Sequence, residues 1–176
     1  MNSGETAAAV NPYTAADVEA ILRERGWLGR EVSAEQAAWC ERAAAWLGGH
    51  VADRAGLEDL LGLVFRYDAG EILARVESHV VMSRYAARDV LRKLALMLLE
   101  GTELTPERFQ EIVTVMKTEM ELKGRELFHP IRLALAGRAG EGELDRVILL
   151  LDEAWRAGLG VKTARERIVE FCAGMD

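Results

Sequence analysis

The sequence KGRELFHPIRLALAGR, residues 123–138, differs from the rest of the chain in charge and in pattern. Its one acid is Glu126, so the local charge is +3 in a chain whose net charge is −7. A positive segment on an acidic body attracts anions locally, whatever the net charge. The stretch therefore predicts an anion-binding site or, as the alternative, a solvated cationic loop with a short helix. Its basic side chains are Lys123, Arg125, Arg132 and Arg138.

Pro130 sets the expected start of a helix within this stretch. Proline fits the first helical turn and biases the preceding residue away from helical angles, so we expect a helix from Pro130 to a stop at Gly137. Arg132 would then lie near the unpaired backbone N–H groups of that first turn, where it could help to bind a phosphate or a base edge. The alternative is an ion pair of Arg132 with Glu126 or Glu143.

The composition of the whole chain is that of a globular cytoplasmic protein. Its 176 residues are 50% hydrophobic and 29% charged, enough for one substantial core or two small ones. No apolar run approaches the roughly 20 residues that span a bilayer, and the N-terminus lacks the pattern of a signal peptide. Cys40 and Cys172 lie far apart without a CxxC or a paired histidine, so neither a disulfide nor a zinc site is expected.

The acidic balance limits the nucleic-acid binding that the chain could perform. A sequence pI of about 5.1 argues against generic binding, because nonspecific affinity needs many Lys and Arg contacts to phosphate. Any nucleic acid that the chain holds must therefore meet a small basic patch.

Helix signals recur along the chain, and no segment alternates apolar and polar residues as a half-buried strand does. Helical apolar patterns cover residues 57–64, 83–100, 143–155 and 162–171. N-caps are expected at Thr14, Ser33, Thr105 and Thr163, the third followed by Pro106. The predicted fold class is all-α, with short connections and antiparallel neighbours.

The stretch at residues 123–138 closely resembles the final segment of bacterial glutamyl-tRNA synthetase. The pattern of that family is Lys-Gly-x-x-Leu-Phe-x-Pro-hydrophobic-Arg-x-Ala-Leu-Thr-Gly. Residues 147–151 resemble the leucine-rich helix that follows it, and weaker similarity includes residues 57–60, residues 65–68 and the helix that begins at Thr105. The resemblance covers roughly residues 35–155.

The resemblance implies the all-helical anticodon-binding part of that enzyme, a helical bundle or cage of two packed subdomains. We expect a flexible lead-in at residues 1–12, a first subdomain at residues 13–121 and a second at residues 122–176 that carries the basic motif. Because the chain begins with Met1 and has a lead-in of its own, we expect a free-standing relative of the synthetase rather than a cut fragment.

The resemblance also implies which residues touch RNA. Arg132 matches the family position that contacts the anticodon, with Lys123, Arg125 and Arg138 expected to contact phosphates. The Thr-Pro-x-Leu-Phe segment of the family is replaced by residues 141–145, which keep only Leu144 and carry three acids. Ala136 stands where the family has Thr. These acids would repel RNA phosphate, so the resemblance implies a site that is only partly retained. The candidate RNA-binding residues are Arg132, Arg125, Lys123, Arg138 and Leu144.

No catalytic motif of the family is present in the sequence. The His-Ile-Gly-His and Lys-Met-Ser-Lys types of motif and a glycine-rich strand-turn-helix are absent, so the chain is expected to be no enzyme by itself and at most one part of a split glutamate–tRNA ligase. His50, His79 and His129 stand apart from any triad or metal-ligand spacing, so no catalytic residue, metal or other cofactor is expected. The expected partners are tRNA, with glutamate tRNA as the candidate, and a separate catalytic protein.

A protein-binding role is the rival hypothesis. An adaptor that kept the helical cage and lost the RNA would explain the acidic surface and the altered residues 141–145. Tryptophans expected at the surface, Trp27 and Trp155, would suit a protein partner.

Overall fold

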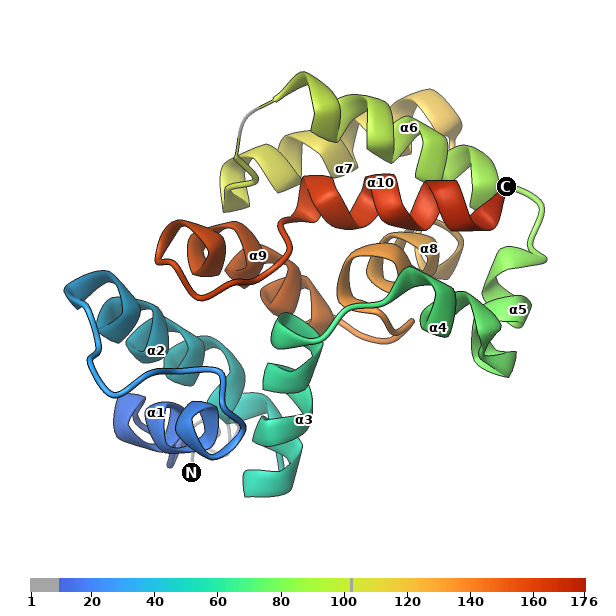
Figure 1. Ribbon diagram of the computed structural model, residues 1–176. Coiled ribbons are helices and arrows are strands. Elements are labelled where there is room, and N and C mark those ends of the chain that lie inside the picture. The colour runs from blue at the N-terminus through green and yellow to red at the C-terminus, as the bar shows by residue number, and fades with distance from the viewer. Residues whose placement is uncertain (1–9, 102) are drawn as a thin grey trace, which may run out of the picture.

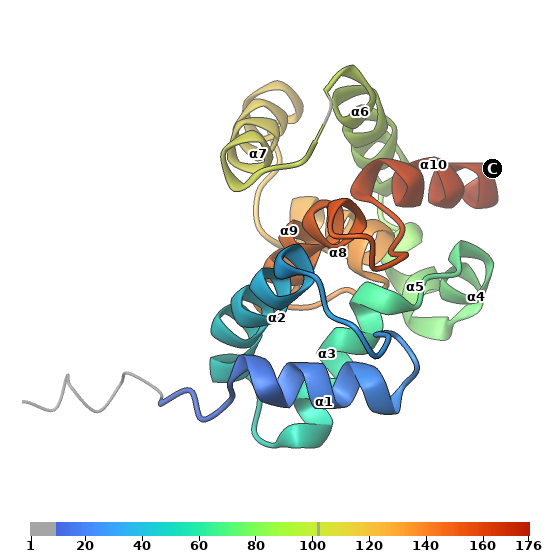
Figure 2. The ribbon, with the colours of Figure 1, turned by 60° about the vertical axis from the view of Figure 1, so that its left-hand side comes forward.

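A computed structural model describes residues 10–101 and 103–176, and these residues form only helices and their connections. The predicted all-α class is confirmed. Figures 1 and 2 show the helices in three tiers, with α8 and α9 between a tier of α1, α2 and α3 and a tier of α6, α7 and α10. The helices are α1 (Ala15–Glu24), α2 (Ala34–Leu47), a 3-10 turn (Gly48–His50), α3 (Arg54–Phe65), α4 (Ala69–Ala74), α5 (Val76–Met82), α6 (Ala87–Glu100), α7 (Pro106–Met120), α8 (Arg125–Ala136), α9 (Glu143–Arg156) and α10 (Ala164–Met175).

The predicted N-caps begin helices as expected. The Ser33 hydroxyl accepts a hydrogen bond from the N–H of Gln36 at 3.1 Å, and the Gln36 side chain accepts one from the N–H of Ser33. Thr163 and Glu166 repeat this reciprocal arrangement at the start of α10. Each such cap satisfies N–H groups that a helix leaves unpaired at its first turn.

Two short helices were not predicted, and the predicted start of α6 was wrong. The pattern at residues 83–100 predicted a helix from its first residue, but α6 begins at Ala87 because residues 83–86 form the turn that joins it to α5. α4 and α5 contain six and seven residues, too few for apolar spacing to recur. The predicted lead-in at residues 1–12 lies mostly outside the described residues, and Asn11 donates to the carbonyl of Ala44 on α2 at 2.8 Å.

The predicted start of a helix at Pro130 was wrong, because α8 begins five residues earlier, at Arg125. Gly124 precedes it with a φ of 61°, an angle that favours glycine. Pro130 lacks the N–H that would bond the carbonyl of Glu126, so α8 forms without one of its backbone hydrogen bonds. Leu127 and Ile131 are fully buried and residues 133–136 are buried as well, and this burial outweighs the cost of the missing bond. The predicted stop is confirmed at Gly137, which has a φ of 82°.

A central position of α8 and α9 follows from which helices they contact. α9 packs against α2 and α3 on one side and against α8 on the other, while α8 also contacts α6, α10 and α5. Trp39 of α2 is fully buried, and its indole N–H donates to the carbonyl of Leu150 on α9 at 3.0 Å. The α8 motif is therefore held on several sides. The boundary expected between residues 121 and 122 stays a prediction.

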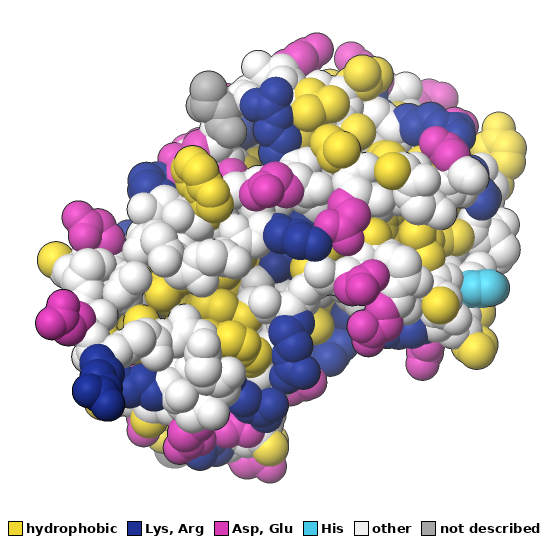
Figure 3. All heavy atoms as spheres, in the orientation of Figure 1, with side chains coloured by type: hydrophobic (Ala, Val, Ile, Leu, Met, Phe, Trp, Pro, Cys, Tyr) yellow, Lys and Arg dark blue, Asp and Glu magenta, His cyan; other side chains and the backbone are white. Residues whose placement is uncertain are grey.

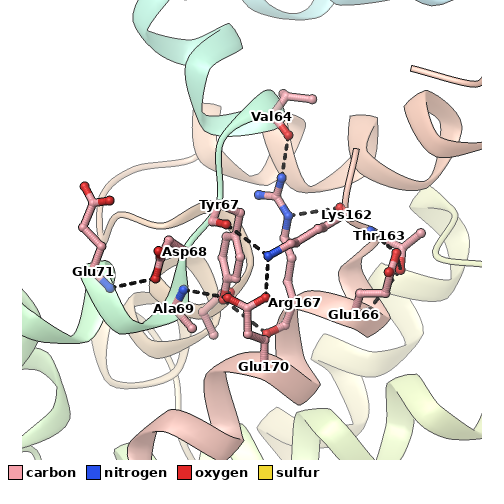
Figure 4. Close-up of polar contacts among 11 residues, drawn as sticks. Val64, Tyr67, Asp68, Ala69, Glu71, Lys162, Thr163, Glu166, Arg167 and Glu170 are labelled. Atoms are coloured by element: carbon pink, nitrogen blue, oxygen red, sulfur yellow. Dashed lines mark hydrogen bonds and ion pairs between the residues drawn. The ribbon is translucent and has the colours of Figure 1, made fainter. Parts of the chain in front are cut away.

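Arg167 of α10 joins three helices from inside the core (Figure 4). Its guanidinium donates to carbonyls at the C-terminal ends of α3 and α8, including those of Leu63 at 2.9 Å and Leu135 at 3.0 Å. It also lies 4.6 Å from the ring centre of Tyr67, whose hydroxyl donates to the carbonyl of Ala134. One buried cation thus satisfies last-turn carbonyls of two helices, which fixes where α8 ends.

No helix among residues 10–101 and 103–176 is long and apolar enough to cross a membrane. Cys40, which is buried, and Cys172 are both free thiols.

Candidate nucleic-acid interface

α8 presents its polar side chains on one side and its apolar side chains on the other. Arg125, His129 and Arg132 recur at spacings of four and three, so they lie along one side of the helix. Leu127 and Ile131 are fully buried on the other side. The basic half of the motif is therefore turned away from the core.

Two neighbouring elements add cations to this side of α8. A guanidinium nitrogen of Arg84, in the turn between α5 and α6, donates to Nδ1 of His129 at 3.0 Å. The ammonium of Lys117 on α7 lies 5.5 Å from the ring centre of Phe128, and the guanidinium carbon of Arg132 lies 4.7 Å from it. We call this group the α8 cluster, consisting of Arg84, Lys117, Arg125, His129 and Arg132.

His129 is the titratable member of the cluster. Desolvation lowers its pKa below the ordinary 6.5, and the positive charges of Arg84, Arg125 and Arg132 lower it further, against an opposing effect of Glu141. The contact with Arg84 acts in the same direction, because arginine can only donate and Nδ1 must therefore accept. The neutral imidazole is the form that this structure favours.

Several cations in and beside the α8 cluster have no acidic partner. Among the described residues, no carboxylate lies within 4.0 Å of the charged group of Arg84, Lys117, Lys123 or Arg125. Most other Lys and Arg side chains in the described part of the chain are engaged in ion pairs. The acidic surface thus leaves uncompensated positive charge around the first half of α8, although Glu126 shares that stretch.

Arg132 is held by the start of α9. Its Nε and Nη2 donate to the two carboxylate oxygens of Asp145 at 2.8 and 3.0 Å, and its Nη1 donates to the carbonyl of Gly140 at 2.7 Å. Its side chain is only 12% exposed. An ion pair was one of the two sequence-based hypotheses, but the partners then named, Glu126 and Glu143, were wrong. The partner is Asp145, which lies two residues further into α9 and faces α8.

Arg138 lies at the opposite end of the motif. It pairs with Asp59 of α3 at 2.9 Å and borders a groove of about 710 Å³ between α3, α4 and the end of α8. Arg75 lines one side of this groove, where its guanidinium donates to the carbonyl of Gly137 at 2.9 Å. Figure 3 shows Lys and Arg side chains gathered near the centre of this face, with acidic side chains beside them. Four arginines and four acids line the groove, so its charges balance, unlike those of the α8 cluster: Arg25, Arg66, Arg75 and Arg138, with Glu58, Asp59, Asp68 and Glu71.

Leu144 lies in the core. It is 1% exposed, and a Cβ added to Gly140 would lie 2.9 Å from its Cδ1. It packs the junction between α8 and α9, and the RNA-binding role expected for it stays a prediction.

Sequence reasoning missed Arg84 and Lys117. They lie far from residues 123–138 in the sequence, and only the packing of α5 and α7 beside α8 brings them to Phe128 and His129. Nothing in their local sequence distinguishes them from other surface cations. No three His, Cys, Asp or Glu side chains converge to hold a metal ion in the part of the chain that the structure describes.

Known proteins resemble most of this chain. Residues 5–154 match the protein family described as the anticodon binding domain. Glutamate–tRNA ligase of Bacillus velezensis is 30% identical over 130 residues, which are 74% of this chain and 26% of that relative. Glutamate–tRNA ligase of Bacillus subtilis is 29% identical over 147 residues, 84% of this chain and 28% of that relative. No solved structure matches the chain significantly.

The family match and the structure agree on what kind of module this is. The chain spans about a quarter of the length of these two relatives, and within it only the anticodon-binding part is found. The match includes α8 and its cluster and ends within α9, so α10 with Arg167 lies beyond it. This chain belongs to the anticodon binding domain family.

Proposed function

We propose that the chain holds the anticodon arm of a tRNA against the α8 cluster. The observation that supports this best is the uncompensated charge of Arg84, Lys117, Lys123 and Arg125 on an otherwise acidic protein. Cations without carboxylate partners can contact phosphate without first breaking an ion pair. The patch is small, as the acidic net charge requires.

Different roles follow for the individual residues. Lys123 and Arg125 contact phosphates directly, and Arg138 does so once it leaves Asp59. In Arg132, Nη1 donates one N–H to Gly140 and Nη2 donates one to Asp145, so each of these two nitrogens keeps a second N–H. Arg132 contacts a base through these two remaining N–H groups. Asp145 occupies the fork of the Arg132 guanidinium, so only these remaining donors are open to a base while the ion pair is intact.

The tRNA that we propose is glutamate tRNA. The curated relatives carry the name glutamate–tRNA ligase, and their similarity to this chain lies in the part that binds an anticodon. Catalytic motifs are absent from these 176 residues, so aminoacylation would need another polypeptide segment or a separate catalytic protein. Such a role would place the protein in the cytoplasm.

A titration with fluorescent glutamate tRNA tests the proposal. Binding of the full chain is measured by anisotropy over a series of salt concentrations, for the wild type, for Lys123→Ala with Arg125→Ala, and for Arg30→Ala. We expect the double variant to bind more weakly and its slope of log affinity against log salt to decrease by about 0.7–0.9 for each lost phosphate contact. Arg30 is an exposed arginine without an acidic partner in the described structure, located between α1 and α2, so Arg30→Ala should bind as the wild type does.

The titration can also reject the proposal. If tRNA at low salt binds the wild type no better than it binds an acidic control protein, the chain does not hold tRNA. If Arg30→Ala weakens binding as much as the double variant does, the α8 cluster is not the interface.

A protein-adaptor function is the second candidate, and Trp155 favours it. Its side chain is 59% exposed and borders a pocket of about 520 Å³ between the C-terminal end of α9 and the start of α10. Trp27, also expected at the surface, is half-buried and stacks on Phe65 with ring centres 4.9 Å apart. Co-elution of the chain with a synthetase catalytic protein after ribonuclease treatment would support this function, and loss of co-elution with the RNA would count against it.

A further inference from the structure

Tyr85 is the most exposed aromatic residue in the described part of the chain. It lies in the turn between α5 and α6, and its side chain is fully open to solvent. A ring in water contributes no burial energy to the fold. Aromatic side chains that lie open beside positive charge are the surfaces on which single-stranded nucleic acids stack their bases.

The charges around this turn favour an anionic ligand. Arg84 and Arg88 flank Tyr85, and among the described residues neither has a carboxylate within 4.0 Å. The nearby acids are Asp89 and Asp176, and Arg92 lies 3.9 Å from the first and 3.1 Å from the second. Arg92 therefore compensates part of this negative charge, while Arg84 and Arg88, one and three positions from Tyr85 in the sequence, have no acidic partner in the described structure.

A pocket of about 410 Å³ opens at the same turn. Leu73, Met82 and Met175 supply apolar walls, and His79, Ser83 and Arg88 supply polar groups. Its volume lies within the range of small-molecule sites, and an apolar floor with a few polar groups suits a nucleobase with its sugar. The pocket shares Ser83 with the turn and Arg88 with the first turn of α6, so a base and a phosphate could be held together there.

The turn is continuous with the α8 cluster. Arg84 adjoins Tyr85 in sequence, and its guanidinium contacts His129 of α8 at 3.0 Å. Among the described residues the other strongly exposed aromatic side chain is that of Trp155, which borders a pocket lined by three acids and two arginines. One of those arginines, Arg156, already pairs with Glu103, so the pocket offers less free positive charge to RNA. Aromatic exposure and uncompensated positive charge thus coincide at Tyr85.

We propose that the turn between α5 and α6 is a second nucleotide-binding site, at which Tyr85 stacks on an unpaired base while Arg84 and Arg88 contact the adjoining phosphates. The ligand is single-stranded RNA that extends from the α8 cluster. This inference rests on the proposed tRNA-binding function and adds a contact surface that residues 123–138 do not contain. Duplex RNA, whose bases are already stacked, cannot use the ring.

The test compares two RNAs and three variants of the full chain. Anisotropy titrations use the stem-loop of the glutamate tRNA anticodon and a fully paired RNA of equal charge. Tyr85→Ala should bind the stem-loop about tenfold more weakly and leave duplex binding unchanged, because one base–aromatic stack is lost. Tyr85→Phe should keep the affinity of the wild type, because the ring is retained. Leu96→Ala, which truncates an exposed apolar side chain of α6 outside the turn, should also bind as the wild type does.

Each outcome separates this inference from the function on which it rests. If Tyr85→Ala binds the stem-loop normally while Lys123→Ala with Arg125→Ala does not, the second site is wrong and the tRNA-binding function stands. Equal weakening toward both RNAs would also overturn the stacking role. If the wild type binds neither RNA, both proposals fail. Thermal unfolding of Tyr85→Ala should match the wild type, which excludes misfolding as the cause of any loss.

Discussion

At the scale of single residues, we expect His129 to couple proton binding to RNA binding. In the free protein the imidazole is desolvated and faces Arg84, Arg125 and Arg132, so its pKa lies below 6.5. A phosphate placed among these arginines would screen their charge and favour the imidazolium. RNA would therefore raise the pKa of His129, and binding would take up a proton.

We expect tRNA affinity to increase as the pH falls through the pKa of His129 in the complex toward its pKa in the free protein, which lies below 6.5, by up to about tenfold for each unit by which RNA raises that pKa. Anisotropy titrations at constant ionic strength measure this dependence. His129→Gln should flatten it, whereas His50→Gln, which changes an exposed histidine outside the cluster, should not. An unchanged pH dependence in His129→Gln would contradict the coupling.

Without RNA, the stability of the fold should respond to this group in the opposite sense. Because the pKa of His129 in the folded protein is depressed, the stability that the neutral imidazole contributes is present above the unfolded value of 6.5. It is lost as the pH falls through the folded pKa. We therefore expect acid to weaken the free protein through the same group that strengthens RNA binding.

At the scale of elements, the contact between Arg132 and Asp145 ties α8 to α9. The side chains of Arg132 and Asp145 are 12% and 25% exposed. Removal of either one would leave the other as a poorly solvated charged group without a partner. Arg132→Ala and Asp145→Ala should each lower the free energy of unfolding by about 1–3 kcal/mol. Denaturant titration measures this.

The same two variants should have opposite effects on tRNA binding. Asp145→Ala removes a negative charge beside the cluster and frees the fork of Arg132, so affinity should rise, whereas Arg132→Ala should lower it. Arg132→Lys distinguishes the effect of the positive charge on tRNA binding from the effect of the planar guanidinium, because lysine keeps the charge without the planar fork. If both alanine variants weakened tRNA binding equally, Arg132 would act only by holding α8 against α9.

Sequence reasoning worked best where local chemistry decides the structure. The reciprocal cap of Ser33 with Gln36 and the glycine stop at Gly137 depend on neighbouring residues alone, and both were predicted. Pro130 was misleading, because its local preference for a helix start is outweighed by burial of Leu127 and Ile131 against other helices. That burial is a property of the packed molecule, which no local rule contains.

The candidate site was predictable only in part, for a similar reason. Arg125 and Arg132 lie within one motif, so their shared side of a helix follows from spacing. Arg84 contacts His129 although 45 positions separate them in the sequence. Asp145 forms its ion pair with Arg132 only because α9 turns back along α8. Such partners depend on how α5 and α9 pack against α8.

At the scale of the whole molecule, Arg167 holds together three helices that are distant in sequence. Burial lowers its pKa to about 10, so it stays charged at neutral pH, and among the described residues its hydrogen-bond partners are backbone carbonyls rather than a carboxylate. Lys162 and Glu170 form an ion pair at the surface nearby, which Figure 4 shows beside the buried guanidinium. The end of α8, and with it the position of Arg138, depends on a residue beyond the family match.

Arg167→Met tests this dependence, since methionine keeps much of the apolar contact and removes every donor. Carbonyls of Leu63, Val64 and Leu135 would then lack their partner inside the core. We expect the free energy of unfolding, measured by denaturant titration, to fall by about 3–5 kcal/mol. Arg165→Ala is the matched control on α10, because Arg165 is exposed and its loss should cost less than about 1 kcal/mol. A variant Arg167→Met as stable as the wild type would mean that apolar packing alone joins α3, α8 and α10.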